Sequence, residues 1–299
     1  MPNVIANGIQ LEYDTIGNPA FPPLLLIMGL GGQLVHWDEG FCRELAARGH
    51  FVIRYDNRDT GLSTRFEAAG LPDMSALLTA RLQGQSIQAP YTLDDMADDA
   101  AKLLEALDIE KAHICGSSMG GMIAQTAAIR YPRRLLSLIS IYSTTGNPDL
   151  PQPQPAAMEA LLSPQPVERQ AYIDFNVITM QAIAGSGFPF DEQFIRSISA
   201  RAYDRGFYPP GVGRQMMAVM AQENRTSTLG SVTVPTLVIH GTADPLVPAE
   251  HGQATANAIP GAQLLLVEGM GHDLPHTKGP WPQVIDAIAD HTRIDKMTI

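Results

Sequence analysis

Short apolar runs alternate with segments of helical periodicity along most of the chain. Continuous apolar runs fit strands that are covered on both faces, as in a mainly parallel sheet. The sequence predicts such strands at residues 24–28, 51–55, 112–115, 135–142, 235–241 and 263–267. Apolar residues at helical spacing predict helices at residues 41–47, 93–107 and 122–128. This alternation predicts an α/β fold, with helices packed on the faces of a parallel sheet.

The amino terminus follows a different pattern. Residues 9–14 alternate apolar and polar side chains, which is typical of a half-exposed strand. Asn7-Gly8 lies just before them, and this dipeptide favours a tight two-residue turn. We therefore expect an antiparallel hairpin at one edge of the sheet.

The pattern changes after residue 143. The proline-rich stretch 147–155 excludes a helix interior or a central strand. Helical spacing then recurs at residues 156–162, 167–184, 191–203 and 213–222. The sequence therefore predicts an α/β core made of residues 1–143 and 230–299, and a helical cap made of residues 144–229, inserted after the sixth strand. An insertion at this place can serve as a lid that shapes the substrate pocket.

The predicted strand at 112–115 leads into Gly116-Ser117-Ser118-Met119-Gly120, which has the spacing G-x-S-x-G. This spacing is typical of a nucleophile elbow, a sharp strand-to-helix turn with a serine at its apex. In that register the apex residue is Ser118, not Ser117. A turn that only caps a helix has a similar composition, but the strand before it and the helix after it favour the elbow.

An acid and a histidine follow in the order that such a serine requires. Asp244 comes directly after the predicted strand 235–241, and His272 lies on a glycine loop after the strand 263–267. Parallel α/β sheets place their ligands at these strand ends. Alone, Asp244 reads as a turn former and His272 as a surface or structural residue, but together with Ser118 they follow the order of a hydrolytic triad. Asp149 is the alternative acid.

A glycine loop, residues 29–32, follows the strand at 24–28. A dinucleotide fingerprint would need a third glycine at a spacing that this loop lacks, and plain loop flexibility is another explanation. We favour an oxyanion loop, because glycines let backbone N–H groups turn toward a developing negative charge. The expected donors are the amides of Leu30 and Met119, with Gly29 as the alternative to Leu30. The charged turn 56–63 is either catalytic or a hydrogen-bonded loop, and we favour the loop.

Composition narrows the possible partners. Lys and Arg number 20 against 31 Asp and Glu, a net charge of −11, whereas nucleic-acid binding needs a basic face. The two cysteines provide no disulfide framework, no apolar stretch is long enough to span a bilayer, and the amino terminus lacks the pattern of a signal peptide. We expect a soluble cytoplasmic protein without nucleic-acid or membrane partners.

Metal and cofactor chemistry are not expected either. His272 and His276 have the spacing of ligands on one helical face, but Pro275 between them argues against such a helix. The zinc-binding pattern H-E-x-x-H is absent from the sequence. The predicted chemistry of Ser118, Asp244 and His272 needs no metal and no cofactor.

Together these stretches resemble the α/β-hydrolase superfamily over nearly the whole chain. The matching pieces are residues 26–32, 54–63, 116–121, 240–244 and 269–272. Met28-Gly29, where many members have His-Gly, and the stretch 54–63 are most similar to bacterial esterases of the aclacinomycin methylesterase type.

The resemblance implies hydrolysis of a carboxylic ester through an acyl-enzyme, with Ser118, Asp244 and His272 as the triad. The many Met and Phe side chains of residues 144–229 favour a small, largely apolar substrate. The resemblance also leaves two alternatives. One is a C–C bond hydrolase that uses the same serine on a diketone. The other is a small-molecule receptor that keeps the pocket without turnover.

Overall fold

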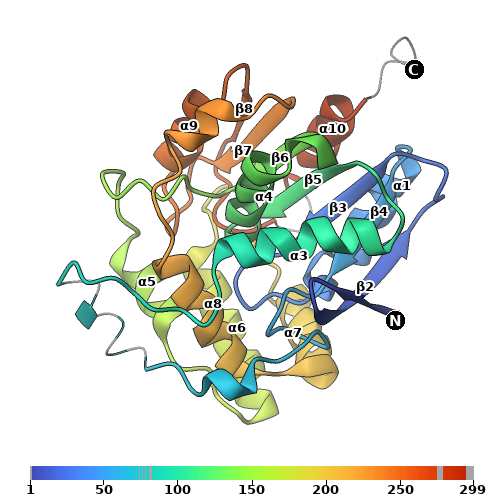
Figure 1. Cartoon of the computed structure of the whole chain (residues 1–299). Coiled ribbons are helices and arrows are strands. Elements are labelled where there is room, and N and C mark those ends of the chain that lie inside the picture. Colours follow the sequence, from blue (N-terminus) through green and yellow to red (C-terminus); the bar gives the residue numbers. More distant parts are fainter. Residues whose placement is uncertain are drawn as a thin grey trace.

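One sheet of eight strands organises the computed structural model, which describes residues 2–73, 75, 77, 79–80, 83–274 and 279–293. The strand order is β1-β2-β4-β3-β5-β6-β7-β8 (Figure 1). The pairs β1–β2 and β2–β4 are antiparallel, and the other pairs are parallel, which confirms a mainly parallel sheet. The strands are β1 Asn3–Ala6, β2 Ile9–Ile16, β3 Pro23–Ile27, β4 Phe51–Tyr55, β5 Ala112–Ser117, β6 Leu135–Ile141, β7 Thr236–Gly241 and β8 Gln263–Val267.

The predicted hairpin is present at the edge of the sheet. Asn7 and Gly8 connect β1 to β2 with φ values of 51° and 75°, so both residues are left-handed, as a tight two-residue hairpin turn requires. Ala6 pairs with Ile9 across the turn.

Helices cover both faces of the sheet, and β3 shows why its apolar run is continuous. Leu25 and Ile27 pack into the hydrophobic cluster that includes residues of α3 and α4, while Leu24 and Leu26 pack into the cluster that includes α1 and α10. In Figure 1, α3 and α4 cross in front of the strands. The helices of the core are α1 Glu39–Ala47, α3 Leu93–Ala106, α4 Met119–Arg130, α9 Ala249–Ala258 and α10 Trp281–His291.

The helix α9 was not predicted from the sequence. Its residues are mostly small or polar, and of its ten residues only Gly252 and Thr255 are buried. A helix without an apolar stripe gives no periodic signal. None of the described helices is long and apolar enough to cross a membrane.

The insertion after the sixth strand is helical, as predicted. Its helices are α5 Pro155–Leu162, α6 Arg169–Ile183, α7 Glu192–Gly206 and α8 Pro209–Met220, and they gather below the sheet in Figure 1. Two of them, α6 and α8, begin two or more residues away from the predicted start. The carboxylate of Glu168 accepts the first free amides of α6, which fixes its start at Arg169. Prolines in the first turn of α8 lack the N–H that would be unpaired there, so this helix starts before residue 213.

The two ends of the insertion lie side by side. The Arg225 N–H donates to the Thr145 carbonyl at 2.8 Å, and the Thr226 hydroxyl donates to the Thr145 hydroxyl at 3.0 Å. The Arg225 guanidinium also donates to the Thr144 carbonyl at 2.8 Å. The insertion therefore leaves and rejoins the core through one paired neck.

The charged loop 56–63 is hydrogen-bonded and buried, as favoured from the sequence. Arg205 on α7 donates to an Asp56 carboxylate oxygen at 2.6 Å. Arg214 on α8 binds both carboxylate oxygens of Asp59, at 2.8 and 2.9 Å. These ion pairs attach the helices α7 and α8 to the core.

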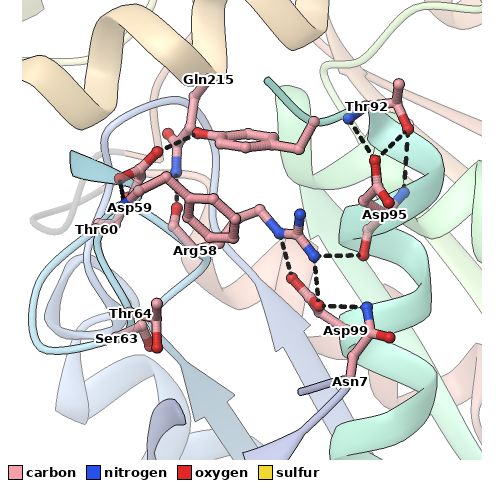
Figure 2. Close-up of polar contacts among 12 residues, drawn as sticks. Asn7, Arg58, Asp59, Thr60, Ser63, Thr64, Thr92, Asp95, Asp99 and Gln215 are labelled. Atoms are coloured by element: carbon pink, nitrogen blue, oxygen red, sulfur yellow. Dashed lines mark hydrogen bonds and ion pairs between the residues drawn. The ribbon is translucent and has the colours of Figure 1, made fainter. Parts of the chain in front are cut away.

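A third ion pair attaches the same loop to α3 (Figure 2). The Arg58 guanidinium donates to both Asp99 oxygens at 2.7 Å, and the Asn7 amide donates to one of them at 2.9 Å. The guanidinium also lies 5.1 Å from the ring centroids of Phe66 and Tyr91. Arg58 therefore joins the hairpin, the loop and α3 in one buried cluster.

Removing Arg58 is expected to be costly. Arg58→Met would leave the buried Asp99 carboxylate without its cation, which costs roughly 3–5 kcal/mol of unfolding free energy. Arg130→Met is the control, because Arg130 pairs with Asp94 and Asp98 at the surface, where ion pairs contribute about 0–1 kcal/mol. Urea unfolding of both variants measures the difference. Equal losses would contradict the buried pair's role in stability.

Candidate active site

Ser118 lies at the turn between β5 and α4 with a left-handed backbone, φ 55° and ψ −120°. Such a conformation is strained for a serine and persists only where neighbours hold it. The Ser118 N–H donates to the Ile141 carbonyl at 2.9 Å. The Ser118 carbonyl accepts from the Gly121 N–H at 2.9 Å and from the Ser143 hydroxyl at 2.8 Å. The predicted strand–turn–helix is present, and hydrogen bonds hold both the N–H and the carbonyl of its apex residue.

The flanking glycines are required by close backbone packing. A Cβ on Gly116 would lie 2.0 Å from the Gly120 carbonyl oxygen, and one on Gly120 would lie 2.1 Å from the Ile27 carbonyl oxygen. No side chain fits at either position. The start of α4 therefore packs directly against the backbone of β3 and β5, which places the Ser118 side chain at the ends of these strands.

The structure brings Ser118, His272 and Asp244 together. Ser118 Oγ lies 2.9 Å from His272 Nε2, and His272 Nδ1 lies 2.8 Å from Asp244 Oδ2. A carboxylate only accepts hydrogen bonds, so the proton of a neutral imidazole is on Nδ1. Nε2 then has a lone pair facing the Ser118 hydroxyl. This arrangement can remove the proton from Ser118.

Asp244 is held as an anion. Its Oδ1 accepts from the N–H groups of Leu246 at 2.9 Å and Val247 at 2.8 Å. Burial alone would raise the pKa of Asp244, but the facing His272 ring with its hydrogen bond, the nearby His240 ring and the Val247 N–H outweigh this effect. They hold the pKa well below its ordinary value. The alternative acid, Asp149, is exposed, and its N–H bonds to the Asn147 side chain.

Two aromatic neighbours of this chain of hydrogen bonds were not predicted. The Tyr142 ring lies 4.7 Å from the His272 ring, centroid to centroid, and burial raises the Tyr142 pKa. His240 Nε2 lies 2.7 Å from the Val247 carbonyl oxygen and 3.6 Å from Asp244 Oδ2. Both residues occur at the ends of predicted strands, and that position is the signal that could have drawn attention to them.

The glycine loop lies beside Ser118. A Cβ built on Gly29 would be 3.2 Å from the Ser118 Cβ and 3.7 Å from its Oγ. Within the part of the chain that the structure describes, the amides of Gly29, Leu30 and Met119 have no hydrogen-bond acceptor. Two other amides of the loop are occupied, because Gly31 N–H donates to Gln215 at 2.8 Å and Gly32 N–H donates to the Gly29 carbonyl at 3.1 Å.

The insertion contacts the loops that carry Asp244 and His272. The His272 N–H donates to the Ile183 carbonyl at the end of α6, and the Gln154 N–H donates to the Pro245 carbonyl, both at 2.8 Å. Met28, Tyr142 and Phe188 belong to or pack against one hydrophobic cluster. Phe188 of the insertion therefore packs against the apolar core that includes Tyr142, the ring beside His272.

Among the described residues, no group of three or more His, Cys, Asp or Glu side chains could hold a metal ion. His276 and Pro275, which entered the sequence argument on metals, lie outside the described residues. The expectation that the chemistry needs no metal and no cofactor stays a prediction.

Residues 22–278 match the profile of the alpha/beta hydrolase fold family. The chain is a member of this family. Among curated proteins, this alpha/beta hydrolase is 32% identical over 310 aligned residues to rhodomycin D methylesterase DauP from Streptomyces sp. (strain C5), with 97% of each chain covered. The resemblance stated from the sequence is confirmed.

Solved structures show the same fold. An esterase from Thermogutta terrifontis is 26% identical to this alpha/beta hydrolase, with a TM-score of 0.68 and 97% of each chain covered. A meta-cleavage product hydrolase from Pseudomonas fluorescens IP01 has a TM-score of 0.72 over 97% of each chain, at 20% identity. The second likeness shows the fold alone.

The low pKa of Asp244 gives this alpha/beta hydrolase a pH-dependent share of its stability. Because the folded-state pKa is below the ordinary 3.8, the contribution is present above about pH 4 and is lost as the pH falls toward the folded-state value. Asp244→Asn is therefore expected to be less stable than the wild type at pH 7, and the gap should narrow below pH 4. Urea unfolding at pH 7, 5, 4 and 3 measures it, with the exposed Asp149→Asn as control. A gap independent of pH would contradict this assignment.

Proposed function

We propose that this alpha/beta hydrolase is a serine esterase that cleaves a small, largely apolar carboxylic ester through an acyl-enzyme. The observation that carries the proposal is the continuous hydrogen-bonded chain from the Ser118 hydroxyl through His272 to Asp244. A serine hydroxyl is a weak nucleophile unless a base removes its proton. The 2.9 Å contact with Nε2 of His272 supplies that base.

In the proposed first step, Ser118 Oγ forms a bond to the ester carbonyl carbon while its proton moves to His272 Nε2. Asp244 orients the imidazole and stabilises the imidazolium that forms. The carbonyl oxygen becomes an oxyanion, which the amides of Leu30 and Met119 would bind. Each such donor is worth about 3–4 kcal/mol at the transition state.

The intermediate collapses when the ester C–O bond breaks and His272 returns the proton to the leaving alcohol. Water then attacks the acyl-enzyme, with His272 again taking a proton, and the acid leaves Ser118 restored. In this scheme Leu30 and Met119 act in both halves of the reaction, because each half passes through an oxyanion.

Two observations favour a methyl ester of an apolar acid. The relative with 32% identity over nearly the whole chain carries the name methylesterase. The Tyr142 ring beside His272 also packs in one apolar cluster with Met28 and Phe188, which supports an apolar substrate. We further propose that residues 144–229 form the cap that closes the acyl pocket. A cytoplasmic location is part of the same proposal.

Ser118→Ala is expected to lower kcat for methyl and p-nitrophenyl esters by about 10⁴-fold or more, because the nucleophile is lost. Ser117→Ala is the matched control: Ser117 is the neighbouring buried serine, and its hydroxyl contacts Met28 Sδ at 3.5 Å. It should keep turnover and labelling by a fluorophosphonate probe, both of which Ser118→Ala loses.

A wild type that binds esters without releasing acid would favour the receptor alternative. Turnover of a vinylogous diketone but of no ester would favour the C–C bond hydrolase. A Ser118→Ala variant with full activity would exclude the proposed nucleophile.

The acid is tested separately. Asp244→Asn is expected to reduce kcat by roughly 10⁴-fold, since the imidazole would lose its oriented tautomer. Asp149→Asn removes the alternative acid and should leave kcat unchanged. Steady-state rates on one p-nitrophenyl ester compare the two variants, and the reverse ranking would assign the role to Asp149.

A further inference from the structure

Gln215 on α8 is a fully buried polar residue that reaches from the insertion to the glycine loop. Its side-chain oxygen accepts from the Gly31 N–H at 2.8 Å. Its side-chain nitrogen donates to the Arg58 carbonyl at 2.8 Å and to the Thr60 hydroxyl at 2.7 Å. Figure 2 shows Gln215 pointing from its helix toward the loop that carries Arg58, Asp59 and Thr60. One side chain thus joins three segments that are far apart in the sequence.

The orientation of the Gln215 amide is determined by its partners. A carbonyl oxygen only accepts hydrogen bonds, so the nitrogen of Gln215 must face the Arg58 carbonyl. Its oxygen is then the group that faces the Gly31 N–H. In a flipped amide, the nitrogen of Gln215 would face the Gly31 N–H, donor against donor, and its oxygen would face the Arg58 carbonyl, acceptor against acceptor. Both contacts are unfavourable in a buried site.

The helix that carries Gln215 is itself held against both loops. Arg214, the preceding residue, binds both carboxylate oxygens of Asp59. A Cβ built on Gly31, which has φ 66°, would lie 3.0 Å from the Val212 side chain. Because α8 is held in this position, the Gln215 side chain can keep the glycine loop in place.

The Gly31 contact decides which amides of the loop remain available. Gly31 and Gly32 donate to Gln215 and to the Gly29 carbonyl. Leu30 lies between Gly29, which is beside Ser118, and Gly31. Its N–H has no acceptor among the described residues. Without Gln215, the Gly31 amide would be left unpaired, and the loop would be free to turn that amide or another toward a new acceptor.

We propose that Gln215 is a positioning residue that holds the glycine loop through Gly31 so that the Leu30 amide is presented to the oxyanion. The proposal rests on the proposed esterase function. It makes the insertion a part of the oxyanion site through one side chain, in addition to any role in covering the substrate.

The test compares Gln215→Met with Gln125→Met. Methionine keeps the length of the side chain and removes its hydrogen bonds. Gln125 is the matched control, since it is also fully buried and bonds to Ser140 and Arg225 but not to the glycine loop. Kinetics on a p-nitrophenyl ester give kcat and KM. Inhibition by phenylboronic acid, which forms a tetrahedral adduct with an active serine, reports on the oxyanion site itself.

Gln215→Met is expected to lower kcat by about 10–100-fold, less than or close to the ~10²–10³-fold cost of a lost oxyanion donor. KM should change by less than about twofold, and phenylboronic acid should bind correspondingly more weakly. Gln125→Met should lose stability without these changes.

Two results would overturn the proposal: a kcat loss no larger than that of Gln125→Met, or a loss confined to KM. If Gln215→Met does not fold, Thr60→Val replaces it, because it removes one acceptor of the Gln215 nitrogen. It should lower kcat severalfold, and an unchanged kcat would overturn the proposal. A wild type without ester turnover would instead refute the proposed function.

Discussion

The left-handed backbone of Ser118 is the constraint on which the rest of the structure depends. A non-glycine residue in such a conformation costs about 1–3 kcal/mol, which the surroundings must offset. Here the Ile141 carbonyl and the Ser143 hydroxyl hold the two peptide groups of Ser118. The start of α4 packs against the backbone of β3 and β5 through Gly116 and Gly120. The packing of this helix on the sheet therefore also determines where Ser118 lies. The packing that closes the core also sets the Ser118 hydroxyl opposite His272.

Most of the fold could be predicted because its signals are local. A strand buried on both faces must be apolar at consecutive positions, and Leu24 to Ile27 are all fully buried. The turn Asn7-Gly8 carries its conformation in its own residues. In α9 this logic fails, because few of its side chains are buried and no apolar period marks it. The start of α8 was also misplaced: its first turn contains prolines, which are favoured at that position of a helix.

The candidate site divides in the same way. Ser118, Asp244 and His272 could be found because each follows a strand, and parallel strands end at one edge of a sheet. The contact between Gly31 and Gln215 joins residues 184 positions apart. It depends on how α8 packs against the core, and no local pattern in the sequence around Gln215 indicates this packing. Buried partners of this kind become visible only in three dimensions.

The paired neck at Thr145 and Arg225 has an evolutionary consequence. When the ends of a segment touch, a change in its length costs little chain entropy, so the length of the insertion can vary while the core keeps its fold. Replacement of the whole insertion by another segment has a condition in this chain. The carboxylates of Asp56 and Asp59 belong to the core, whereas their partners Arg205 and Arg214 belong to the insertion. Another segment without these arginines would leave two buried carboxylates without their cations, which is destabilising. We therefore expect the loop 56–63 and the insertion to change together.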